Sequence, residues 1–130
     1  MANTKGRTQK KQTRVVETGK IYITATFNNT FVTITDSKGQ PIVTGSCGMH
    51  GFKGTRKSTP YAGTVTMENA LNTALMTHGL RKADVFVKGI GPGREAALRV
   101  IRSSKLEIEK LVDITPIPHN GVRPPKIRRV

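Results

Sequence analysis

The sequence predicts an α/β fold with a mixed sheet of about five strands and two main helices. Residues 20–27 alternate apolar with polar residues, which is the pattern of a half-buried strand, and turn signals separate two further short strand candidates up to residue 46. Farther along the chain, two segments carry apolar residues at helical spacing, and a short apolar run follows each of them. Such an order of elements indicates helices packed on one sheet. We find no internal repeat and no second core, so a single domain is expected.

The first three strands are expected to form two hairpins. A strand over residues 20–27 turns at Asn28-Asn29, which tolerates positive φ, into a second strand over residues 30–35. A second turn signal at residues 36–39 leads into a third, antiparallel strand over residues 41–46. The apolar face of the first strand comprises Ile21, Ile23, Ala25 and Phe27.

A flexible basic loop is expected over residues 48–58, where three glycines interrupt the periodicity. The run Ser58-Thr59-Pro60 offers a capping hydroxyl and a proline at the first position of a helix that ends at Gly79. The first helix therefore begins directly after the basic loop.

A second helix is expected between the last two strands. A buried strand over residues 83–87 leads through a glycine turn, residues 89–93, into a helix that begins near Arg94. Ala97, Val100, Ile101 and Ser104 share one face of this helix. Residues 106–115 give the last strand.

Positive charge dominates the composition. The 130 residues include 22 Lys and Arg against 8 Asp and Glu, a net charge of +14, which favours nucleic acid or an anionic membrane as partner. Residues 1–14 and 119–130 are basic and contain no acid. We therefore expect a basic N-terminal extension (1–18), an α/β core (19–117) and a basic C-terminal tail (118–130), with both ends mobile until an anion holds them.

The sequence offers little support for catalysis or for a metal site. Cys47 and His50 are three residues apart but lack further ligands, and the carboxylates are scattered. The glycine turn is not a Walker sequence, and Pro92 removes a backbone donor from it. Either a tight strand-to-helix connection or a contact with one RNA phosphate explains this turn. We expect no enzyme activity, no metal and no cofactor.

Two alternatives to RNA binding use the same charge. A membrane-surface protein needs an amphipathic basic helix with large apolar residues, which neither expected helix provides. A free-standing regulator is the other alternative. The lone Cys47 fits a reducing compartment.

Four segments resemble those of a known family. Residues 51–61, Gly-Phe-Lys-Gly-Thr-Arg-Lys-Ser-Thr-Pro-Tyr, and residues 113–125, Asp-Ile-Thr-Pro-Ile-Pro-His-Asn-Gly-Val-Arg-Pro-Pro, resemble hallmark segments of the small-subunit ribosomal protein S11 family, also called uS11. Residues 29–36 and 88–94 extend the resemblance, in order, over essentially the whole chain.

The resemblance implies both a fold and a function. The fold is a three-layer α/β arrangement with a ribonuclease H-like sheet order, without ribonuclease chemistry. The function is binding of 16S-type small-subunit rRNA on the platform, bridging several rRNA helices and contributing to the Shine-Dalgarno cleft that holds mRNA. Implied neighbours are ribosomal proteins S7 and S18 and initiation factor three, with no membrane and no homo-oligomer. The implied location is the cytoplasmic ribosome, with an organellar ribosome as the alternative.

The residues expected to contact rRNA combine the charge pattern with the resemblance. Lys and Arg fix the position of phosphates, and hydroxyl, imidazole and amide groups reach sugars or base edges. The expected contacts are Lys5, Arg7, Lys10, Lys11, Arg14, Lys53, Thr55, Arg56, Lys57, Ser58, Arg94, His119, Asn120, Arg123, Lys126, Arg128 and Arg129.

Overall fold

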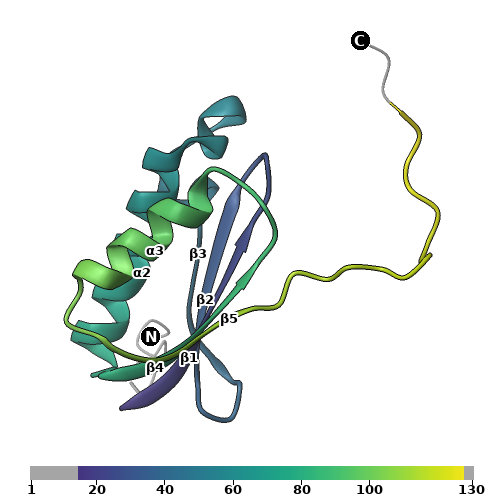
Figure 1. Ribbon diagram of the computed structural model, residues 1–130. Helices are drawn as coiled ribbons and strands as arrows, with labels where there is room; N and C mark the ends of the chain where they lie inside the picture. Colours follow the sequence, from purple (N-terminus) through teal and green to yellow (C-terminus); the bar gives the residue numbers. More distant parts are fainter. Residues whose placement is uncertain (1–14, 128–130) are drawn as a thin grey trace, which may run out of the picture.

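A computed structural model describes residues 15–127, which form one five-stranded mixed sheet with two helices (Figure 1). The strand order across the sheet is β3-β2-β1-β4-β5. This mixed sheet, its order and the two helices confirm the predicted α/β class and the ribonuclease H-like order that the resemblance implies. The elements are β1 (Thr18–Ala25), β2 (Thr30–Asp36), β3 (Pro41–Ser46), η1 (Cys47–His50), η2 (Gly54–Ser58), α2 (Pro60–Thr77), β4 (Lys82–Lys88), α3 (Gly93–Ser103) and β5 (Glu107–Asp113).

The strand order follows from how neighbouring strands pair. β2 is antiparallel to both β1 and β3, as the two predicted turns require. β4 is parallel to both β1 and β5. The helix α3 connects β4 to β5, and α2 connects β4 to β3, which runs in the same direction as β1. One detail of the first strand differs from the prediction. The strand ends at Ala25, so Phe27 lies in the turn and is 74% exposed.

The core lies between one face of the sheet and the two helices. Ile21, Ile23 and Ile34 on the sheet are fully buried, as are Met67 of α2 and Ile101 of α3 to within 1%. Alternate residues of β1 and β4 are buried and half-buried, which is the pattern of a sheet covered on one face.

The helices pack side by side on that same face (Figure 1). Residues 15–127 therefore form two layers, one of helices and one of sheet. The three-layer arrangement implied by the resemblance is not seen in them, because no described helix covers the other face.

The predicted helix signals are confirmed. The Thr59 hydroxyl accepts a hydrogen bond from the Ala62 N–H at 3.2 Å, and Pro60 is the first helical residue of α2. Gly79, at φ 68°, follows the end of this helix. None of the described helices is both long enough and apolar enough to cross a membrane.

Candidate nucleic-acid interface

Four connecting segments leave the sheet at the same end. β1, β3, β4 and β5 all run in the same direction, so their carboxyl ends lie at the same end of the sheet. We call this the carboxyl end. The segments that leave it are the turn 26–29, Cys47 with the basic loop 48–58, the glycine loop 89–92 and the C-terminal segment 114–127. Both helices also begin here, so their N–H-rich, partly positive ends add to the basic side chains.

The basic loop presents its cations to solvent. Lys53, Thr55 and Arg56 are exposed, and Lys57 and Ser58 are partly exposed. No ion pair to Lys53, Arg56 or Lys57 is present within residues 15–127. The three charges are therefore free to attract phosphate.

This loop is more ordered than the sequence predicts, because it folds into the short 3-10 helices η1 and η2. Inside η2, the Ser58 hydroxyl donates to the Thr55 carbonyl at 2.8 Å, and the Thr59 hydroxyl donates to the Arg56 carbonyl at 2.9 Å. These bonds fix the backbone that carries Arg56 and leave its side chain outside.

Cys47 anchors the start of the loop. The side chain is fully buried, with its Sγ 3.8 Å from the Thr30 carbonyl oxygen and 3.5 Å from the Thr66 hydroxyl oxygen. The Cys47 N–H donates to Oδ1 of Asn29 at 3.3 Å. Cys47 thus packs as a small core residue. In the part of the chain that the structure describes, no three His, Cys, Asp or Glu side chains form a metal-binding group.

The backbone of the glycine loop packs closely against the backbone of the turn between β1 and β2. A Cβ atom on Gly91 would stand 2.2 Å from the carbonyl oxygen of Thr26, closer than any side chain tolerates. This contact favours the tight strand-to-helix connection as the reason for the glycines.

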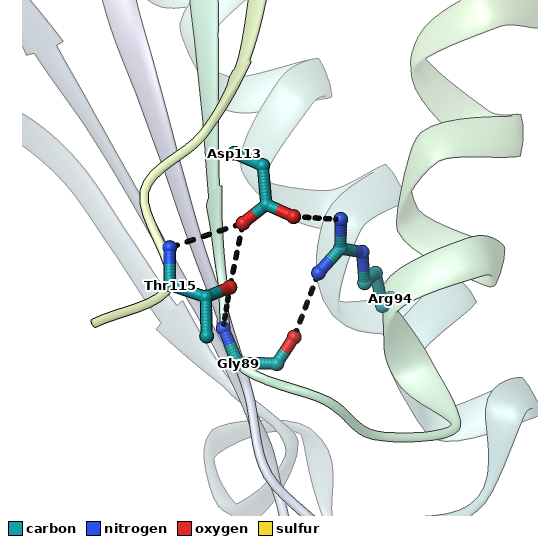
Figure 2. A network of polar contacts seen from close by, with 4 residues as sticks. All are labelled: Gly89, Arg94, Asp113 and Thr115. Atoms are coloured by element: carbon teal, nitrogen blue, oxygen red, sulfur yellow. Dashed lines mark hydrogen bonds and ion pairs between the residues drawn. The ribbon is translucent and has the colours of Figure 1, made fainter. Parts of the chain in front are cut away.

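A polar network then joins this loop to the C-terminal segment, as Figure 2 shows. Arg94 donates from Nη1 to the Gly89 carbonyl at 2.8 Å and from Nη2 to Oδ2 of Asp113 at 2.9 Å. The Thr115 N–H and hydroxyl both donate to Oδ1 of Asp113, at 3.0 and 2.6 Å. The Gly89 N–H donates to the Thr115 hydroxyl oxygen at 3.0 Å. The network fixes the direction in which the C-terminal segment leaves β5.

This network occupies hydrogen-bond donors of Arg94, which the sequence predicts as an RNA contact. Its side chain is 29% exposed, and both terminal nitrogens have protein partners. Sequence reasoning missed Asp113 and Thr115 as parts of the surface. The Asp-x-Thr spacing at the end of a strand, which suits a local side-chain turn, was the available signal.

The C-terminal segment carries four of the predicted contacts. Residues 116–127 are exposed, form no helix or strand, and run away from the core (Figure 1). His119, Asn120, Arg123 and Lys126 lie along this stretch. The remaining predicted contacts, Lys5, Arg7, Lys10, Lys11, Arg14, Arg128 and Arg129, lie outside the described residues.

A comparison with family models decides what kind of protein carries this surface. The model described as Ribosomal protein S11 matches residues 19–129, which include the sheet, both helices, the basic loop and the C-terminal segment. The chain belongs to the ribosomal protein S11 family. As an S11 family member, it is a structural, rRNA-binding protein of the small ribosomal subunit.

The network makes a prediction about titration in this S11 protein. The hydrogen bonds from Thr115, followed by the one from Arg94, hold the pKa of Asp113 well below its usual value of 3.8. A lowered pKa stabilises the folded state above pH 3.8, and this contribution is lost as the pH falls toward the folded pKa. Because the carboxylate is exposed and screened by solvent, we expect only a small change in stability.

The Thr115→Val variant is expected to raise the Asp113 pKa toward 3.8, whereas Thr115→Ser, which keeps the hydroxyl, is expected to hold it low. A carbon-13 NMR titration of the Asp113 carboxyl measures this directly. An ordinary pKa in the wild-type protein would contradict the network.

Proposed function

We propose that this S11 family protein binds 16S-type rRNA on the platform of the small subunit, where it bridges several rRNA helices and contributes to the Shine-Dalgarno cleft. The position of the basic loop and of the start of the C-terminal segment at the same end of the sheet, on its two outer strands, supports this proposal most strongly. The role is structural, with no catalysis and no cofactor. Ribosomal proteins S7 and S18, initiation factor three and mRNA are the proposed neighbours, and a membrane or a second copy is not.

Two different parts of the surface supply the contacts. In the basic loop, Lys53, Arg56 and Lys57 neutralise phosphates, and the hydroxyls of Thr55 and Ser58 add hydrogen bonds to sugar or phosphate. Their position on the short η2 helix limits the conformational entropy that binding removes. The basic loop is therefore the preorganised part of the interface.

The C-terminal tail, residues 118–130, reaches other RNA. Extended at about 3.1 Å per residue, residues 118–127 span roughly 30 Å, enough to reach a second rRNA helix. Arg123 and Lys126 contact phosphates, and His119 and Asn120 reach sugars or base edges. The N-terminal extension, residues 1–18, adds further phosphate contacts through its basic residues. Residues 19–117 are the core that holds these arms.

Deleting residues 119–130 tests the bridging role. These residues contribute four basic side chains, so we expect weaker binding to an rRNA fragment and a salt slope, d log K/d log [salt], that is about 3 smaller in magnitude. The melting temperature of the free protein is expected to stay nearly unchanged, because the described residues of this segment are all exposed. A melting temperature that fell by many degrees would show that the segment is part of the core.

Assembly in the cell is tested by co-sedimentation. The tagged protein is expected to migrate with small ribosomal subunits through a high-salt gradient, in the cytosol or in an organelle. Crosslinks from that fraction to ribosomal proteins S7 and S18 would support the proposed neighbours. Sedimentation with membranes, or as free protein, would contradict the proposal.

A further inference from the structure

The face of the sheet opposite the helices carries a row of side chains that phosphate binding does not explain. We call it the open face. The register places Thr33, Tyr22, Phe86 and Val112 side by side across β2, β1, β4 and β5. Paired residues of neighbouring strands project to the same side of a sheet, so these four share the open face.

Two aromatic rings stand at the centre of this row. Tyr22 and Phe86 stack with their ring centroids 5.1 Å apart and their planes 16° from parallel. Both are half-buried, so the pair is fixed by its neighbours and still reaches solvent. Beyond Tyr22 the row continues with Thr33, whose side chain is much shorter than the ring. Phe31, on the same face, is 46% exposed.

Lysines surround the aromatic pair. Asp84 of β4 is in register with Lys20 of β1 on one side and with Lys110 of β5 on the other. Lys88 lies two residues beyond Phe86 on β4. Residues two apart on a strand share a face, so these charges border the pair. Together, the aromatic rings and the lysines suit the open face to an anionic ligand that contains flat rings.

Asp84 supplies the second, independent observation. Its Oδ1 atom is buried and has no hydrogen-bond partner within residues 15–127, although two lysines flank it in the register. A buried acceptor without a donor costs free energy that a bound donor would recover. The carboxylate lies two residues before Phe86 on β4, on the same face of the sheet as the aromatic pair.

We propose that the open face binds unpaired bases of single-stranded RNA. A base stacks on the Tyr22–Phe86 pair, the lysines contact its flanking phosphates, and Asp84 accepts a hydrogen bond from an amino group on the base edge. Stacking on sheet aromatics is a general way in which proteins hold unpaired bases, and paired RNA cannot use it because its bases are already stacked. This inference rests on the proposed RNA-binding function and adds a second surface, for unpaired RNA.

The test compares two RNA probes on the full-length protein: a short single-stranded RNA carrying one 2-aminopurine, and a fully paired RNA hairpin. Replacing Tyr22 and Phe86 together with leucine is expected to lower the affinity for the single strand about tenfold and to abolish the loss of 2-aminopurine fluorescence. Affinity for the hairpin is expected to stay within about twofold. Tyr22→Phe, which keeps the ring, is expected to bind like the wild-type protein.

Asp84→Ala separates the hydrogen bond from simple charge. Removing a negative charge alone predicts tighter RNA binding. Loss of the acceptor predicts instead that the preference for adenine, cytosine or guanine over uracil, which lacks an amino group, disappears. An unchanged base preference with tighter binding would overturn the role of Asp84.

A second measurement leaves the open face intact. The chain has two tyrosines and no tryptophan, so a Tyr61→Phe variant has Tyr22 as its only tyrosine. Its fluorescence is expected to be quenched by the single strand and not by the hairpin. Hairpin binding without single-strand quenching would overturn this inference alone, whereas failure to bind either RNA would overturn the proposed function. An open face that instead binds another protein would leave single-strand affinity unchanged in the leucine variant.

Discussion

Replacing Lys53, Arg56 and Lys57 together with glutamine is expected to lower the affinity for structured rRNA about a hundredfold at physiological salt. Each phosphate contact contributes about 0.7–0.9 to the salt slope, so three contacts account for this loss and reduce the slope by about 2–3. The fold is expected to survive, because no described ion pair depends on these side chains. Filter binding over a range of salt concentrations measures both quantities.

A matched control removes the same charge from the opposite end of the sheet. Lys38, Arg81 and Lys105 are also exposed, and they lie in the turn after β2 and in the segments that precede β4 and β5. Their replacement with glutamine is expected to weaken rRNA binding much less. Equal losses in the two triple variants would mean that net charge alone, and not the carboxyl end, determines binding.

The Gly91→Ala variant is expected to destabilise the protein by about 3 kcal/mol and to lower its melting temperature by about 10 °C. The new methyl group would stand 2.2 Å from the Thr26 carbonyl oxygen and 2.8 Å from its carbonyl carbon. Both are backbone atoms, so the turn between β1 and β2 must move away from the glycine loop. Thermal unfolding followed by circular dichroism measures the effect.

Gly48→Ala is the control for this substitution. A Cβ atom there would meet nothing closer than 3.9 Å, and Gly48 is not among the positive-φ glycines. Its stability is expected to change by less than about 1 kcal/mol. If Gly91→Ala proved as mild as Gly48→Ala, the close packing of the two loops would be refuted.

Local signals accounted for most of the fold. The third strand has the predicted bounds, Pro41–Ser46, because a turn and a proline mark its start. Thr59 and Pro60 fix the start of α2 through chemistry confined to neighbouring residues. Phe27 shows the limit of periodicity: it continues the apolar alternation, yet the turn begins before it.

What the sequence could not supply depends on register between distant strands. Tyr22 and Phe86 are separated by 64 positions and stack only because β1 and β4 are parallel neighbours. The ion pair between Arg94 and Asp113 likewise requires that β5 lie next to β4 and end beside α3. The basic loop was predictable as a set of charges, whereas its position at the same end of the sheet as the C-terminal segment required the strand order and directions.

Ultraviolet crosslinking of the protein to rRNA in purified small subunits, followed by mass spectrometry of the crosslinked peptides, tests the central claim most directly. We predict crosslinks in residues 53–58 and 115–126, which leave the carboxyl end of the sheet. Crosslinks concentrated at the opposite end, in residues 37–40 and 104–106, with none in the basic loop or the C-terminal segment, would contradict it.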